Sequence, residues 1–309
     1  MKNVDKKLWY KYIKTYESFN KEIPDELKKI FKEVRDIIGN PSDSFNINID
    51  LKKMDFCDLI IELEVVFEKL NSGISYEDKD IIYYSNVNIN DLVLGKNRTK
   101  IHIIIKDLFL NVDKLCSVIS HEIRHIYDVY TINEECDMKS FIKSLYYKEL
   151  YKNEDNKYFL NFLNFVYLSL EHELIARNTM IWEMFIYSKC SKDVLYKLYQ
   201  SSYMYESFNV LKSFEYIDLI NVPDVIEKVN NFINYFGGTL CNNKNDILIF
   251  FDNWKKYFND KSEEYLKEGY NILENILSVN ETKNNNVSLR NVKDILLYIH
   301  NNFILSRNY

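Results

Sequence analysis

The chain has 309 residues, 47% hydrophobic and 28% charged, enough for one large folded domain or two modest ones. Its 6 glycines and 3 prolines exclude collagen-like and turn-rich all-β architectures and favour long helices. A formal net charge of −6 argues against a general nucleic-acid binder, and no run approaches the roughly 18 apolar residues of a membrane span. The five scattered cysteines fit neither a disulfide framework nor a cysteine-rich zinc site. We therefore expect a cytoplasmic protein without nucleic-acid or membrane partners.

The first third of the chain is predicted to mix helices and strands. Amphipathic stretches over 5–19 and 24–38 predict two helices, the second ending at Gly39. Alternation of apolar and polar residues predicts a strand over 45–51, whereas helical spacing predicts a helix over 57–70. Two runs rich in β-branched and aromatic residues predict further strands, over 80–84 and 100–106.

From residue 111 to the end, the pattern is almost entirely helical. Asparagine-rich segments at 242–245 and 280–286 are predicted to be loops between the last helices. We predict an α+β, mostly helical fold in two parts. Residues 1–130 would form a mixed α/β part, and residues 131–309 a large helical part.

One motif carries chemistry. His121-Glu122-Ile123-Arg124-His125 matches the pattern His-Glu-x-x-His within a predicted helix over 112–130. Histidines four residues apart lie on one helix face, where both imidazoles can reach one zinc ion. Glu122 is then placed to take a proton from the attacking water without binding the metal. The alternative is a chance match in which both histidines merely form hydrogen bonds in the core.

The surroundings of the motif bear on this choice. A buried helix directly after the predicted strand Ile101–Ile105 favours the zinc interpretation, and that strand could be an edge strand that pairs with an extended peptide. His102 alternates with its apolar neighbours on this strand, so we expect it to face solvent or a neighbouring strand. Asp128 lies on the ligand face of the helix, where it could orient a zinc histidine or be a solvated helix-end residue.

Zinc requires a third protein ligand, and the chain lacks the third histidine of the metzincin pattern. The segment Ser169–Arg177 offers three candidates, and we favour Glu173 over Glu171 and His172. Glu173 shares a predicted apolar face with the small residues Ser169 and Ala176, and a lone carboxylate there requires a metal or a cation. We expect its helix to pack closely on the motif helix. Arg177 could be an ion-pair partner or stabilise an oxyanion.

The motif, followed 48 residues later by Glu173-x-x-Ala176, resembles the gluzincin metallopeptidases, over about 20 residues in all. The resemblance implies a zincin-like fold for residues 1–130. It also implies Zn²⁺ held by His121, His125 and Glu173, with Glu122 as the catalytic general base, and a protein or peptide substrate. The predicted function is zinc-dependent peptide hydrolysis. The alternatives are a non-catalytic helical interaction protein and a metal sensor.

Overall fold

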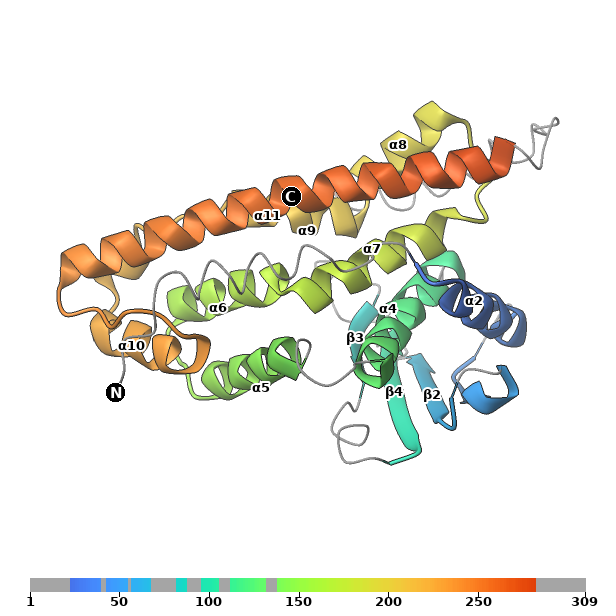
Figure 1. Cartoon of the computed structure of the whole chain (residues 1–309), viewed down its shortest axis with the longest axis horizontal. Helices are drawn as coiled ribbons and strands as arrows, with labels where there is room; N and C mark the ends of the chain where they lie inside the picture. Colours follow the sequence, from blue (N-terminus) through green and yellow to red (C-terminus); the bar gives the residue numbers. More distant parts are fainter. Residues whose placement is uncertain are drawn as a thin grey trace, which may run out of the picture.

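The computed structural model of the protein describes residues 23–39, 43–54, 57–67, 82–87, 96–105, 112–131 and 138–281. These residues are mostly helical, with a small mixed sheet in the first part of the chain (Figure 1), which confirms the predicted fold class. The helix predicted over 5–19 lies outside the described residues. Among the described helices, none is both long and apolar enough to cross a membrane.

The sheet contains strands β1 (Phe45–Asp50), β2 (Ile60–Phe67), β3 (Ile82–Val87) and β4 (Arg98–Ile105) in the order β1-β2-β4-β3. β2 and β4 are parallel, whereas β1 and β3 pair antiparallel at the two edges. The prediction that Ile101–Ile105 form an edge strand is therefore wrong. Hydrogen bonds to β2 and β3 occupy both sides of β4, so it cannot pair with a peptide.

β2 also corrects the helix predicted over residues 57–70. Ile61, Leu63 and Val65 alternate along the strand and are fully buried. The intervening Glu62 and Glu64 lie on the opposite, polar face. Each forms an ion pair with the neighbouring strand β4, Glu62 with Arg98 at 3.1 Å and Glu64 with Lys100 at 2.7 Å. The apolar residues of this segment fit both the 3.6-residue period of a helix and the two-residue period of a strand. Pairing with β4 makes it a strand.

His102 behaves as predicted, on the polar face of β4. Its Nδ1 lies 2.5 Å from Glu64 Oε2 on the adjacent strand. The sheet thus has one polar face and one apolar face, typical of a sheet covered on one side only.

Two helices cover the apolar face of the sheet, namely α2 (Asp25–Ile38) and α4 (Val112–Thr131), both close to their predicted ranges. α2 contributes Leu27, Ile30, Phe31 and Val34 to this core, and α4 contributes Leu115, Ile119, Ile123 and Ile126. A short 3-10 turn, Leu51–Met54, connects β1 toward β2. This first core fixes the rotation of α4 about its own axis.

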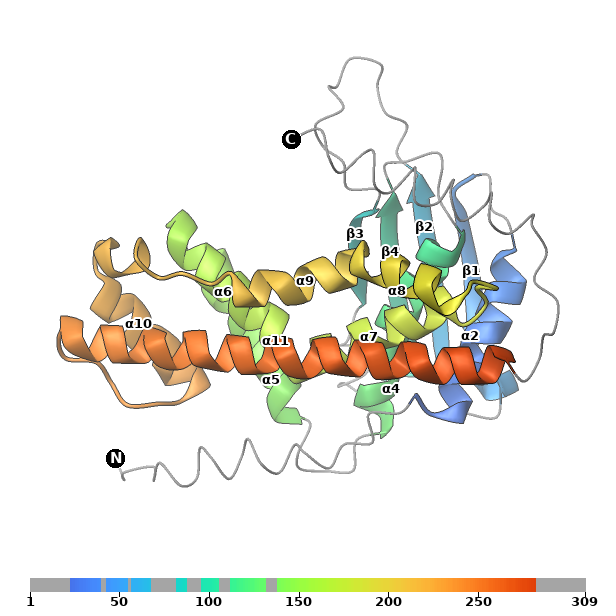
Figure 2. The same cartoon turned by 90° about the horizontal axis from the view of Figure 1, so that it is seen from above.

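The rest of the described chain is helical. Its elements are α5 (Met138–Lys152), α6 (Lys157–Ser169), α7 (Glu171–Phe185), α8 (Lys192–Gln200), α9 (Tyr203–Lys212), a 3-10 turn (Leu219–Asn221), α10 (Val225–Phe236) and α11 (Lys244–Glu281). Figure 2 shows α11 running along the whole length of this part. The predicted loop at 242–245 gives way to α11 from Lys244, and that at 280–286 lies beyond the described residues except for the last turn of α11.

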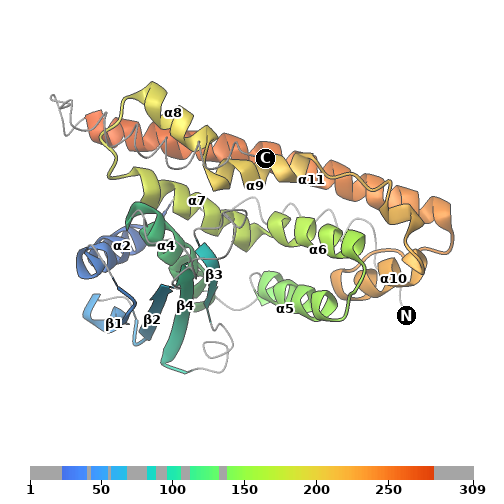
Figure 3. The same cartoon turned by 180° about the vertical axis from the view of Figure 1, so that it is seen from behind.

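The helical part has its own core, rich in phenylalanine and built from α6 to α11. Met180 and Trp182 on α7 pack against both cores. Figures 1 and 3 show α7 between α11 and α4, with the sheet on the far side of α4. The close packing of α7 on α4 confirms the predicted contact between the two motif helices, and Ser169 and Ala176 are both buried. The domain boundary at residue 130 stays a prediction.

The region predicted as one helix around Glu173 is in fact two. Leu170 has an extended backbone (φ −63°, ψ 134°) that separates α6 from α7. Its carbonyl accepts the first hydrogen bond of α7, from Leu174 N. Glu173 therefore lies in the first turn of α7, where the helix dipole favours a negative charge.

Candidate metal centre

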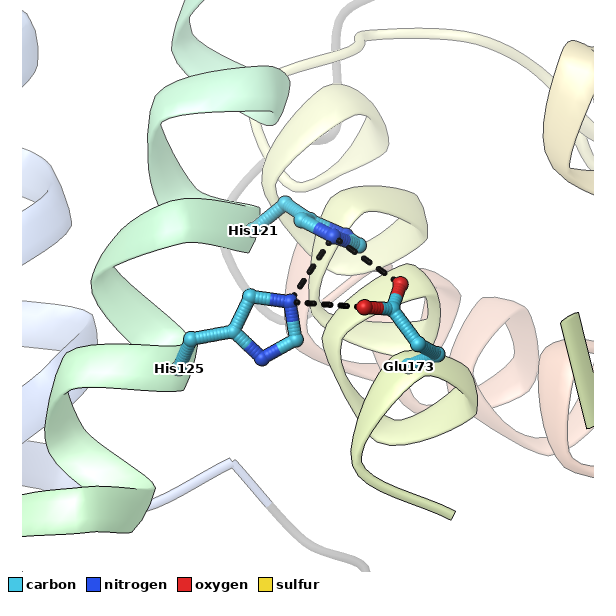
Figure 4. A group of neighbouring side chains, drawn as sticks. All are labelled: His121, His125 and Glu173. Atoms are coloured by element: carbon cyan, nitrogen blue, oxygen red, sulfur yellow. Dashed lines mark hydrogen bonds and ion pairs between the residues drawn. The ribbon is translucent and has the colours of Figure 1, made fainter. Parts of the chain in front are cut away.

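Two histidines project from α4 toward α7 (Figure 4). Ile119, Ile123 and Ile126 on α4 are buried in the core against the sheet. His121 and His125 lie on another flank, one helical turn apart, and their side chains are 13% and 5% exposed. Their Nε2 atoms are 3.1 Å apart. The sheet-facing core of α4 thus directs both imidazoles at the neighbouring helix.

Glu173 meets the two histidines from α7. Its Oε2 lies 3.5 Å from His121 Nε2, and its Oε1 lies 3.5 Å from His125 Nε2. The side chain is 5% exposed. The structure therefore brings together the three predicted ligands, and within the described residues they form the single group of such side chains close enough to hold a metal ion.

The spacing of the three donors suits a small tetrahedral ion. Bonds of about 2.0–2.1 Å at tetrahedral angles separate neighbouring ligand atoms by about 3.3 Å, and the observed separations are 3.1, 3.5 and 3.5 Å. Two imidazoles and one carboxylate are also the donor set of a His₂Glu zinc site. The residues present thus fit a zinc ion.

Two of the three candidate ligands are held in the protonation state that metal binding requires. Burial holds the pKa of His125 well below its usual range, so its imidazole is neutral. Burial alone would raise the pKa of Glu173, but His125, His121 and His172 outweigh it, and the pKa of Glu173 lies well below its ordinary value. A metal needs neutral imidazoles and an ionised carboxylate. Burial thus keeps His125, and the neighbouring imidazoles keep Glu173, in the state in which each binds a metal.

The predicted general base is buried beside this group. Glu122 follows His121 on α4 and is 5% exposed. Burial, followed by the charge of Glu173 and a hydrogen bond to it, raises the pKa of Tyr167 well above its usual value, and Glu122 adds to that rise. The Glu122 carboxylate is thus close enough to the Tyr167 hydroxyl to act on its charge.

The rejected ligand candidates occupy different surroundings. Glu171 lies 3.4 Å from Lys261 on α11 and takes no part in the cluster. His172 is buried at the edge of the cluster, its Nε2 3.6 Å from Glu173 Oε1, and burial lowers its pKa to about 4. His172 thus neighbours the third ligand without belonging to the group of three.

Of the two roles that the sequence left open for Asp128, the structure does not support the orienting of a zinc histidine. Its Oδ1 accepts a 2.7 Å hydrogen bond from Arg124 Nε, one turn back on α4. The Nδ1 atoms of His121 and His125 have no hydrogen-bond partner among the described residues. Arg124, whose charge is unusual at this position of the motif, forms an ion pair with Asp128 instead.

Arg177 has a structural role that agrees with the ion-pair alternative. Its Nη1 donates to the Leu168 carbonyl at 3.1 Å, and its Nη2 lies 3.7 Å from Glu173 Oε2. The residue thus ties the end of α6 to the first turn of α7.

Tyr167 is the site residue that sequence reasoning missed. In one continuous helix Tyr167 shares a face with Glu171 rather than with Glu173. The break at Leu170 changes the phase of the helix and brings the Tyr167 hydroxyl to Glu173. Neither glycine nor proline marks this break, so the sequence carries no local signal for it.

Comparisons with protein-family models, curated proteins and solved structures gave no match to this chain. Functional inference therefore depends on the chemistry of the site.

Proposed function

We propose that the protein is a zinc-dependent metallopeptidase of the gluzincin type. The observation that carries this proposal is the buried group of His121, His125 and Glu173, with a carboxylate, Glu122, next to the first ligand. A bound zinc ion would supply a Lewis acid that polarises the scissile carbonyl and acidifies the attacking water. The resemblance of the motif to gluzincins supports the same assignment.

Glu122 performs the proton transfers in this proposal. It takes a proton from the attacking water as the new carbon–oxygen bond forms. It then gives this proton to the amide nitrogen as the carbon–nitrogen bond breaks, so that the products are a carboxylic acid and an amine, between which the remaining acidic proton moves in solution. Glu173 and the two histidines hold the metal and do not exchange protons.

A metal-sensing role is the second candidate, and the depth of the site favours it. The three ligand side chains are only 5–13% exposed, which suits a site that binds metal without turnover. A sensor requires the ligands but does not require Glu122, and this difference separates the two functions.

The test combines metal analysis with a peptide-library cleavage assay. His125→Ala and Glu173→Ala should lose stoichiometric zinc, whereas His102→Ala, a histidine on the polar face of β4, is the matched control and should retain it. Glu122→Gln should keep zinc but lose turnover by about 10²–10⁴-fold, the usual contribution of general acid–base catalysis. Equal turnover in wild type and Glu122→Gln at equal zinc content would exclude the mechanism in which Glu122 is the general base. Zinc binding without cleavage of any peptide would favour the sensor.

A further inference from the structure

Three tyrosines form a continuous row of rings from the metal centre toward the surface. The rings of Tyr167 on α6 and Tyr147 on α5 stack with their centroids 4.8 Å apart and 25° between planes. The ring centroid of Tyr151, one turn further along α5, lies 5.5 Å from that of Tyr147. We call these residues the tyrosine row.

The inner end of the row touches the proposed catalytic site. The Tyr167 hydroxyl interacts with Glu173. The carbonyl of the next residue, Leu168, accepts a 3.1 Å hydrogen bond from Arg177, whose Nη2 lies 3.7 Å from Glu173 Oε2. The charge of Glu173 also reaches Tyr147, where it adds to the effect of burial on the pKa. The row is thus continuous with the metal ligands.

The outer end of the row is open. Tyr167 and Tyr147 are half-buried, and Tyr151 is 39% exposed. The row is therefore accessible at Tyr151, in contrast to the phenylalanines of the helical core, such as Phe162, which are fully buried.

The middle ring is held in a fixed orientation. The Tyr147 hydroxyl donates a 2.9 Å hydrogen bond to Asn164 Oδ1 on α6, in addition to its ring stacking on Tyr167. A ring fixed at both its face and its hydroxyl loses little further freedom when a ligand stacks beside it. Such a surface suits a planar or bulky apolar group.

We propose that the tyrosine row is the specificity surface of the site and binds an aromatic side chain of the peptide next to the scissile bond. This inference rests on the proposed peptidase function. An extended peptide advances about 3.3–3.6 Å per residue, so a side chain one or two residues from the reacting carbonyl reaches the ring beyond Tyr167. The substrate class is therefore peptides with Phe, Tyr or Trp beside the cleaved bond.

The experiment measures peptide binding without turnover. Zinc-loaded Glu122→Gln protein is titrated with two fluorescent peptides that differ only in having Phe or Ala beside the bond that wild type cleaves. Because aromatic pairs contribute about 0.5–1.5 kcal/mol, we expect the Phe peptide to bind about 2- to 13-fold more tightly. Tyr147→Ala and the exposed Tyr151→Ala should each reduce this preference at unchanged zinc content.

Tyr146→Ala is the matched control, because Tyr146 neighbours Tyr147 on α5 but packs on Tyr235 of α10, with ring centroids 4.9 Å apart. It should leave the preference intact. A preference that survives both Tyr147→Ala and Tyr151→Ala, or that Tyr146→Ala removes equally, would overturn the inference, as would equal binding of the two peptides. Failure of the peptidase function is a separate outcome, visible as no cleavage of any peptide by the zinc-loaded wild type.

Discussion

Two buried glutamates on α7 have different kinds of partners, histidines for Glu173 and an arginine for Glu183. Glu173, in the first turn, faces the imidazoles of His121 and His125, and the nearest guanidinium nitrogen of Arg177 is 3.7 Å away. Glu183 lies ten residues later, about 15 Å along the helix, and accepts hydrogen bonds of 3.0 and 2.8 Å from Arg35 of α2. Burial of a carboxylate alone therefore does not indicate a metal site. The kind of donor opposite it does.

The cluster of charged side chains around Arg35 and Glu183 joins α2, α4 and α7. Arg35 also donates to Asp113 at the start of α4, at 2.5 Å, and its guanidinium lies over the ring of Tyr187. One side chain from α2 thus holds the beginning of α4 and the end of α7 together. The metal-centre cluster joins the same two helices, with histidines in place of the arginine. We therefore expect the His121, His125 and Glu173 cluster to bind a metal and the Arg35 cluster to hold the helices together. Substitutions in each cluster test this division.

The largest expected effect is on metal affinity. Glu173→Gln keeps the shape of the ligand but removes its charge, and zinc affinity should fall by more than about 100-fold, the upper end of what the loss of an outer contact costs. Glu183→Gln is the same substitution on the same helix and should change zinc affinity by less than about 3-fold, because it removes no ligand. Competition with a zinc chelator measures both. Equal losses in the two variants would contradict the distinction between the clusters.

The second prediction concerns folding stability. Arg35→Met leaves Glu183 buried without its cation, and removal of one partner from a buried pair costs about 3–5 kcal/mol. Urea denaturation at pH 8 measures the free energy of unfolding. Lys32→Met is the control on α2, because Lys32 pairs with Asp36 on the exposed surface, where such a pair contributes about 0–1 kcal/mol. If Arg35→Met costs no more than this control, the Arg35 cluster does not hold the helices.

The third prediction concerns pH. Burial raises the pKa of Glu183 from its ordinary 4.5 to about 7, although Arg35 opposes the rise. Between these values the folded protein keeps a proton that the unfolded chain has released, so the contribution of Glu183 to stability falls as pH rises. Glu183→Gln should therefore gain about 1–3 kcal/mol relative to wild type from pH 4.5 to 7.5. Parallel stability curves for the two proteins would contradict this shift.

The smallest expected effect is at Asp128. Because Asp128 bonds Arg124 rather than a histidine, Asp128→Asn should cost about 0.5–1.5 kcal/mol of stability, the usual net contribution of an intramolecular hydrogen bond. We expect its zinc affinity to stay within about 3-fold of wild type, below the range for loss of a group that orients a ligand. A 10-fold or greater loss of zinc would restore the orienting role that the sequence suggested.

Local patterns predicted much of the fold and most of the metal centre. The four-residue spacing of His121 and His125 places both on one helix face, and the apolar stripe of α4 is legible in the sequence. Glu173 was identifiable because a lone carboxylate stood among small and apolar residues. These inferences needed only the residues within one or two helical turns.

Non-local packing determined what the sequence could not show. The 57–70 segment matches two periods, and only its pairing with β4 makes it a strand. Arg35 and Glu183 are 148 residues apart in the chain, and no local pattern links them. Ile101–Ile105 lie inside the sheet because β3, which comes earlier in the chain, pairs with the outer side of β4 and forms the edge.

The break at Leu170 has a consequence for the evolution of the chain. In a continuous helix, each residue inserted upstream would rotate Glu173 by about 100° and turn it away from the histidines. Because α7 begins anew at Leu170, packing on α4 rather than the phase of α6 sets the direction of Glu173. The segment between the two motif helices can therefore gain or lose residues without displacing the third ligand. Distant homologues are best sought with the two short motifs held fixed and the interval between them left free.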